Sequence, residues 1–214
     1  MGMKEQGLLD ACWHWPVLDE IRVGTPFKYL PTGEAWIYNL LDRAVSNDVY
    51  LLNAPADKAD GTFFRNAAFV GSNEAYIVTA SFNTNRTVQT GNWVDVVLPK
   101  AVFDLPGSVT VEQLHFDDQF SVHNKIRTDL AAAGNLKSVY ADHPYTLGMV
   151  SEMAVDKVAG WQMVTNGWSS YQSAAYATLN FGSFDAANYS ETETDQTFRV
   201  WLRSTAVRVL KISY

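Results

Sequence analysis

The sequence contains a single cysteine, Cys12, among its 214 residues, and it has no run of eighteen apolar residues. A lone cysteine excludes an intrachain disulfide, and we expect it to act as a small buried hydrophobe. Without a long apolar run, no segment is predicted to cross a membrane as a helix. Asp10 interrupts the apolar stretch near the start, so no signal peptide is expected. The sequence does not indicate a cellular compartment.

Basic residues are also scarce. The chain has 16 Lys and Arg against 23 Asp and Glu, which gives a net charge of −7 and a pI near 5.0. Nucleic acids and anionic membranes bind basic surfaces, so neither is expected as a partner.

Motifs for catalysis and cofactor binding are missing from the sequence. It has no P-loop, no dinucleotide glycine fingerprint and no Gly-x-Ser-x-Gly. The histidines, at positions 14, 115, 123 and 143, lack the short spacing of metal ligands. We therefore predict no catalytic residue, no metal site and no cofactor.

Aromatic residues, by contrast, are abundant, with seven Trp, ten Tyr and eleven Phe. Short runs of β-branched and aromatic residues recur about every ten residues and are separated by turn signals. These runs are residues 62–70, 76–82, 93–98, 109–116, 197–202 and 207–212. Such spacing predicts a mainly β fold, an antiparallel β-sandwich of the jelly-roll or immunoglobulin-like kind.

Residues 1–45 have a different pattern. Residues 7–16 form an apolar aromatic run typical of a buried strand, and Thr32 can cap a helix whose apolar positions continue to Ala44. The sequence therefore predicts an N-terminal strand–helix segment over 1–45 and a β-sandwich domain over 46–214. The alternative is a self-contained sandwich whose N-terminal arm packs across one sheet.

Residues 122–195 are harder to assign. Residues 124–133 have helix-forming content, with Gly134 as the stop. Further on, 149–155 and 161–164 are predicted as strands, and Asn166-Gly167 is a hairpin turn signal.

Several segments resemble the accessory β-sandwich behind the barrel of retaining glycosidases. Thr110-Val111-Glu112 leads to Phe116-Asp117-Asp118 and then to 121–124, as in the β-xylosidase and α-L-iduronidase family. The residues Gly33, Ala35, Tyr38, Asn39, Leu40 and Leu41 match that family's last barrel helix, and FRVWLRSTAVRVLKI matches its closing strand pair. The likeness covers about residues 30–125 and the last fifteen, and agarase-type glycosidases with similar trailing sandwiches are a second family that the sequence resembles.

The resemblance implies that a catalytic barrel, in a longer chain or a partner protein, packs against this sandwich, which would be secreted or periplasmic. Retaining glycosidases use two carboxylates about 5–5.5 Å apart, and in this family one belongs to an Asn-Glu pair. Here the only such pair, Asn73-Glu74, lies in a predicted turn that would not raise its pKa. Asp117 and Asp118 are adjacent and point to opposite faces of a strand. No catalytic pair is therefore expected.

Three roles follow. The chain is a non-catalytic accessory sandwich that supports a glycosidase barrel, or a carbohydrate-binding module with exposed aromatic rings, or a structural jelly-roll protein that assembles. For binding an oligo- or polysaccharide, the candidates are Trp161, Trp168 and Tyr171 in the turn-rich segment, followed by Trp93. Core packing is the competing role for each ring.

Overall fold

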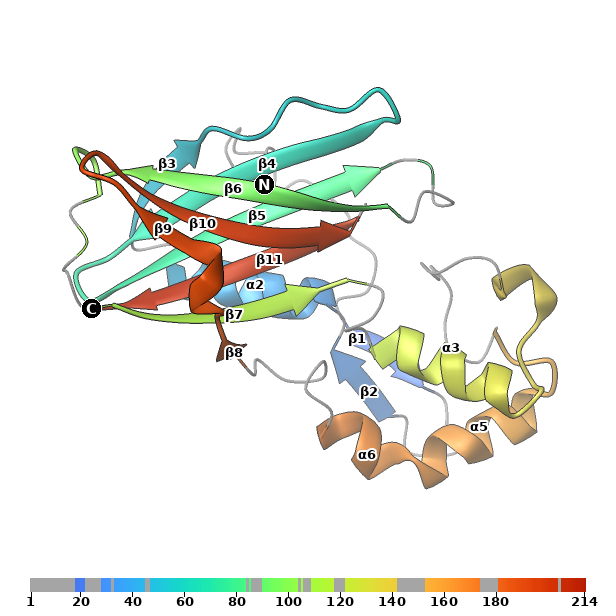
Figure 1. The fold of residues 1–214 in the computed structure, drawn as a ribbon. Helices are drawn as coiled ribbons and strands as arrows, with labels where there is room; N and C mark the ends of the chain where they lie inside the picture. Colours follow the sequence, from blue (N-terminus) through green and yellow to red (C-terminus); the bar gives the residue numbers. More distant parts are fainter. Residues whose placement is uncertain are drawn as a thin grey trace, which may run out of the picture.

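The computed structural model of the chain describes residues 18–21, 28–31, 33–44, 47–83, 85, 90–103, 105, 109–117, 122–141, 153–173, 181–203 and 205–214. Within these ranges the molecule is mainly β, as the sequence predicts, with two antiparallel sheets packed as a sandwich (Figure 1). None of the helices in these ranges is long and apolar enough to span a membrane.

The larger sheet has six strands in the order β3-β4-β5-β11-β7-β8. Their bounds are β3 Asp48–Leu52, β4 Thr62–Val70, β5 Glu74–Asn83, β7 Thr110–Phe116, β8 Gly182–Ser183 and β11 Ala206–Ser213. The predicted hairpin is confirmed, because β4 and β5 pair antiparallel and Gly71 N–H donates to the Glu74 carbonyl at 2.9 Å. Strand β11 lies inside this sheet, where it pairs with β5 of the β4–β5 hairpin on one side and with β7 on the other.

The smaller sheet has three strands in the order β6-β10-β9. They are β6 Gly91–Pro99, β9 Tyr189–Glu191 and β10 Asp195–Arg203, and the short helix η4 (Ala186–Asn188) precedes β9. Strand β10 pairs with β6 along its whole length, while β9 pairs only with residues 196–198. Strand β10 of the smaller sheet is followed in sequence by β11 of the larger sheet.

The main core lies between the two sheets. Period-two alternation directs one side of each strand inward, where the side chains are buried. The smaller sheet contributes Val94, Val96, Leu98, Phe198, Val200 and Leu202, and the larger sheet contributes Phe64, Ala68, Ala75, Ile77, Leu210 and Ile212. The opposite side of β10 carries Arg199, Trp201 and Arg203, as predicted.

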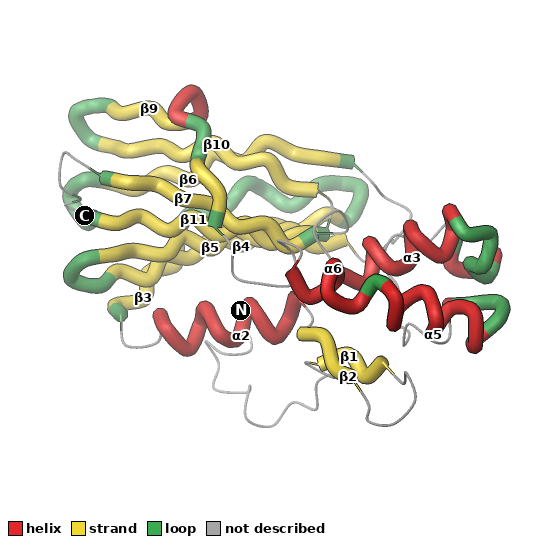
Figure 2. Tube along the Cα trace, turned by 90° about the horizontal axis from the view of Figure 1, so that it is seen from below, coloured by secondary structure: helices red, strands yellow, loops and turns green. Residues whose placement is uncertain are grey.

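The far face of the six-stranded sheet is covered by helix α2, Gly33–Ala44 (Figure 2). The helix that the sequence predicts after Thr32 is thus confirmed, and it ends at Ala44. Its buried side chains Leu40, Leu41 and Ala44 pack against a second apolar cluster that includes Phe69 and Val209. The molecule is therefore layered, with helix α2, the six-stranded sheet and the three-stranded sheet in turn.

A group of helices lies beside one end of the sandwich (Figures 1 and 2). These are α3 (Val122–Ala132), α5 (Lys157–Asn166) and α6 (Trp168–Ser173), with the short η2 (Ser138–Tyr140) between α3 and α5. They enclose their own core around Ile126, Leu130, Met153 and Val164. We call α3, α5 and α6 the helical unit.

The strand predicted over 161–164 is wrong, because these residues lie in α5. The side chain of Asp156 starts that helix by accepting bonds from the N–H groups of Val158 and Ala159. Gly167, taken from the sequence as half of a hairpin turn, instead ends the helix, and its N–H donates to the Met163 carbonyl at 3.0 Å. The helix predicted over 124–133 is confirmed, and Gly134 after it has φ +67°.

Near the N-terminus, strands β1 (Leu18–Ile21) and β2 (Lys28–Pro31) pair as a separate antiparallel ribbon. The strand predicted over 7–16 lies outside the described residues. The origin of residues 1–45 as the end of a glycosidase barrel stays a prediction.

Candidate functional site

Two tryptophans face outward from the smaller sheet. The register of β6 and β10 places Trp93 directly opposite Trp201, and Asp95 opposite Arg199. Because Val94 and Val200 point into the core, these four neighbours point away from it. We call Trp93 and Trp201 the tryptophan pair.

The pair exposes a large apolar surface. Trp93 is 50% exposed and Trp201 is 41% exposed, whereas most large aromatic rings in a sandwich of this size fill the core. The ring centroids lie 5.2 Å apart with an interplanar angle of 63°, an edge-to-face contact. The two indoles therefore form a corner rather than a flat surface.

A charged pair borders this corner. The guanidinium carbon of Arg199 lies 5.6 Å from the Trp93 ring centroid, and its Nε lies 3.6 Å from Asp95 Oδ1. Both side chains are more than half exposed, so the ion pair contributes little to stability. Their donors and acceptors remain accessible to a polar ligand beside the rings.

Gly91 lets the Trp201 ring lie against the backbone of β6. A Cβ atom at position 91 would stand 1.9 Å from Trp201 Cζ2, far inside van der Waals contact. Any larger residue would displace the indole. The position of Trp201 therefore depends on the absence of a side chain at residue 91.

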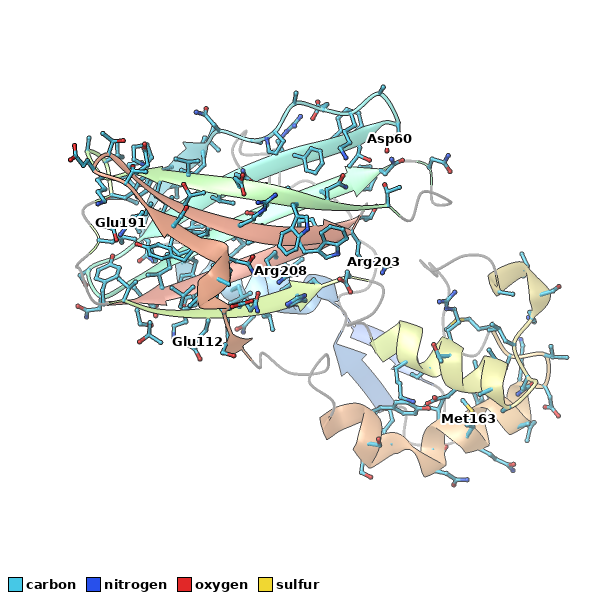
Figure 3. The ribbon with its side chains drawn as sticks, viewed as in Figure 1. Asp60, Glu112, Met163, Glu191, Arg203 and Arg208 are labelled. Atoms are coloured by element: carbon cyan, nitrogen blue, oxygen red, sulfur yellow. The ribbon has the colours of Figure 1, made fainter. Side chains whose placement is uncertain are left out.

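Arg208 lies beneath the pair, between the two sheets. It is only 7% exposed; its Nη2 donates to the Trp201 carbonyl at 2.7 Å, and its Nη1 donates to Gln113 Oε1 at 2.6 Å. Burial lowers the Arg208 pKa to about 10, and the negative charge of Asp117 opposes that shift. The guanidinium is thus charged at neutral pH. Figure 3 shows Arg208 inside the sandwich and Arg203 at the end of β10 nearest the helical unit.

Arg208 belongs to a polar row that crosses the inner face of the larger sheet. The register aligns Asn66, Thr79, Arg208 and His115 on four adjacent strands. Burial, and secondly the charge of Arg208, lowers the pKa of His115 to about 4, so the imidazole is neutral at pH 7. In the described part of the chain, Asn66 Oδ1 and Thr79 Oγ1 are buried without a hydrogen-bond partner.

Three of the four predicted sugar-binding residues lie in the helical unit. Tyr171 is buried in its core, and its hydroxyl donates to Asp129 Oδ2 at 2.7 Å. Trp168 packs against the same core, and Trp161 is partly buried. Only Trp93 of the four lies on the smaller sheet, so the structure does not bring the predicted set together.

Trp201 was not among the predicted binding residues. Its outward direction follows from the alternation in β10, but its neighbour Trp93 is more than one hundred residues away in the sequence. The register between β6 and β10 brings them together, and no local signal in the sequence specifies that register.

The acidic residues considered in the sequence have structural contacts. Glu74 begins β5, accepts a hydrogen bond from Tyr76 at 3.1 Å and lies 3.8 Å from Lys211 Nζ. Asp117 acts on Arg208, and Asp118 lies outside the described residues. Among the residues that the structure describes, no group of three or more His, Cys, Asp or Glu is arranged to hold a metal.

Comparisons of the chain with protein-family models, with curated proteins and with solved structures find no match.

Proposed function

We propose that this chain is a non-catalytic β-sandwich that binds an oligo- or polysaccharide at the tryptophan pair, as an accessory to a polysaccharide-degrading glycosidase. The observation that carries the proposal is the exposed, angled contact of Trp93 and Trp201 on an open sheet face. Indole rings present large apolar surfaces that match the C–H faces of sugar rings, and each indole N–H donates a hydrogen bond.

The angle between the rings selects the form of the glycan. At 63° the two indoles cannot lie on one plane, so they do not match the flat surface of a crystalline polymer. They suit a single sugar ring held in the corner of a soluble chain, with Arg199 and Asp95 beside it for its hydroxyl groups. Soluble glycans are therefore the expected ligands.

The catalytic partner in this proposal comes from the sequence resemblance. Residues 30–125, which resemble the glycosidase sandwich, form α2 and β3 to β7 in the structure, with the described gaps between them. In that arrangement the sandwich would support a barrel and hold substrate near it.

The test is affinity electrophoresis of the purified chain in gels that contain soluble plant or algal polysaccharides, with tryptophan fluorescence titration beside it. We expect retardation by one class of glycan, and at least a tenfold weaker affinity for Trp93→Ala and for Trp201→Ala. Phe82→Ala is the matched control, since Phe82 is 54% exposed on the opposite side of the sandwich.

Other results would point elsewhere. Loss of binding on Trp161→Ala or Trp168→Ala, with Trp93→Ala unaffected, would move the site to the helical unit. A symmetric oligomer that ignores every glycan would support the structural jelly-roll role. Release of sugar in proportion to protein would overturn the non-catalytic assignment.

A further inference from the structure

A second feature lies on the face of the six-stranded sheet that is turned away from the smaller sheet. It does not involve the tryptophan pair. Helix α2 and the strands beneath it leave a cavity of about 240 Å³. Leu40 and Leu41 line its helix side, while Val78, Ala80 and Val207 line its sheet side. For comparison, an engineered apolar cavity of about 150 Å³ binds benzene. The space under α2 is thus large enough for a small organic ligand.

The cavity lies between side chains of helix α2 and two cross-strand rows of the larger sheet. Register places Val78 and Val209 in one row under the helix and Arg65, Ala80 and Val207 in the next row. Alanine at position 80 is too small to fill the space between its neighbours. The cavity therefore extends toward the row that contains Arg65.

Apolar surface continues beyond that row. The next cross-strand pair is Phe63 and Phe82, which point to the same side of the sheet and are 40% and 54% exposed. Neither ring lines the cavity itself; the pair follows the Arg65 row on β4 and β5.

Arg65 is the one charged side chain among the described residues that line the cavity. Its Nη1 forms an ion pair with Asp57 Oδ1 at 3.3 Å and also donates a hydrogen bond to the Phe64 carbonyl oxygen at 2.5 Å. An arginine has five N–H donors, and both of these contacts use the same nitrogen. In the described part of the chain, Nε and Nη2 have no recorded partner, and that edge can hold a carboxylate through two parallel bonds.

We propose that this cavity binds a free aliphatic monocarboxylate, with its hydrocarbon chain between α2 and the sheet and its carboxylate on Arg65. The apolar lining provides for the chain and the single cation provides for the head group. The cavity exceeds the one of about 150 Å³ that binds benzene, so it can take an aliphatic chain of several carbons. Medium-length chains are therefore expected to fit best.

The first experiment measures binding of the whole chain to butanoate, hexanoate, octanoate and decanoate by isothermal titration calorimetry. Burial of each methylene contributes enough to raise affinity about fourfold. We expect affinity to rise by about that factor per methylene and then to level off once the cavity is full. No measurable binding of octanoate or decanoate at millimolar concentration would overturn the proposal.

Variants then test each end of the site. Ala80→Leu places a larger side chain in the cavity and should weaken octanoate binding at least tenfold. Arg65→Gln should weaken octanoate binding about tenfold but leave octanol, which has no charge, unchanged. If Ala80→Leu fails to fold, the comparison of octanoate with octanol on Arg65→Gln still decides the question. Equal loss for both ligands, or no loss for either, would contradict the role of Arg65.

Trp93→Ala and Trp201→Ala serve as controls, since they lie on the other sheet and should bind octanoate as the wild type does. A chain that does not bind octanoate in the cavity can still bind a glycan at the tryptophan pair. A chain that does not bind a glycan can likewise still bind octanoate. The two proposals therefore stand or fall separately. If Ala80→Leu and Arg65→Gln change the binding of a partner protein but not the binding of octanoate, the monocarboxylate assignment is wrong.

Discussion

Arg208 and Trp201 are joined by a hydrogen bond from the guanidinium Nη2 to the backbone carbonyl oxygen, 2.7 Å long. Arg208 stands on β11 of the larger sheet and Trp201 on β10 of the smaller one, so the bond connects the two layers. Pairing with β9 ends at Phe198, so Arg208 supplies a donor at a point of β10 that β9 does not reach. A buried charge thus satisfies the backbone directly behind an exposed indole.

We expect Arg208→Met to lower the free energy of unfolding by about 2–4 kcal/mol, because it removes the charge-assisted bonds that Arg208 donates to Gln113 Oε1 and to the Trp201 carbonyl. Arg208→Lys keeps the charge but cannot span both acceptors, so its loss should be smaller. Urea denaturation followed by circular dichroism measures both values. Less than about 0.5 kcal/mol for the methionine variant would contradict this account.

The depressed pKa of His115 makes stability depend on pH in a defined window. The neutral ring is favoured in the folded state, where the pKa is about 4, against an ordinary value of 6.5. Between pH 6.5 and 4 the unfolded chain binds the proton and the folded chain does not, so stability falls as pH falls, and this contribution is level above and below the window. Because the His115 ring is partly exposed to solvent, its contribution to the free energy of unfolding is limited to about 1–2 kcal/mol.

Thermal melts of the wild type and of His115→Gln from pH 4 to pH 7.5 measure that contribution by difference, which cancels the titration of the carboxylates. The difference between the two melting temperatures should change most between pH 4 and 6.5. Parallel curves throughout the range would show that His115 titrates normally.

Thr79→Val should leave stability unchanged or raise it by up to about 1 kcal/mol. The Thr79 hydroxyl is buried in the described core without a hydrogen-bond partner, so removing it relieves an unsatisfied group at constant volume. Ser81, two residues along the same strand face, donates to the Arg203 carbonyl. Ser81→Ala should therefore destabilise by about 1 kcal/mol in the same urea series, and the opposite order would refute the argument.

Gly91→Ala should weaken glycan binding with little change in the fold. The added Cβ would collide with the Trp201 indole, which can swing outward because that side of the sheet is open. We expect a shifted tryptophan emission maximum, a loss of affinity approaching that of Trp201→Ala, and a stability change of about 1 kcal/mol or less. Unchanged emission together with unchanged affinity would show that the position of the ring does not matter.

Tyr171→Phe should act on the helical unit and not on glycan binding. It removes the hydroxyl that donates to Asp129 Oδ2, a bond to a carboxylate worth about 1.5–3 kcal/mol. Hydrogen exchange resolved by peptide should show faster exchange in α3 and α6, with β6 and β10 unchanged. Weaker glycan binding by this variant would favour the site that the sequence indicated in the helical unit.

The strands of the sandwich were predictable because each has its own period-two pattern and turn signals. Residues 62–70 match β4 in full, and the runs beginning at Tyr76 and Trp93 lie within β5 and β6. The faces of β10 followed from the same alternation. These features depend on near neighbours in the chain, which the sequence displays directly.

Features that depend on distant residues were not predictable. Trp201 becomes a partner of Trp93 only through strand register, and the short apolar run at 161–164 fits a strand as well as a helix until Asp156 caps α5. The polar row through Arg208 needs four strands in register before its members meet. Each case requires tertiary structure to choose between local alternatives.

The central position of β11 has a consequence for how the chain acquires its structure. This strand follows the other described strands in sequence, yet it pairs with both β5 and β7 and buries Val209, Leu210 and Ile212. During synthesis the β4–β5 hairpin and β7 must wait with unpaired edges until residues 206–213 leave the ribosome. Such late, long-range pairing slows folding and exposes edges that aggregate. Without β11, the edges of β5 and β7 that it covers would stay open to such aggregation.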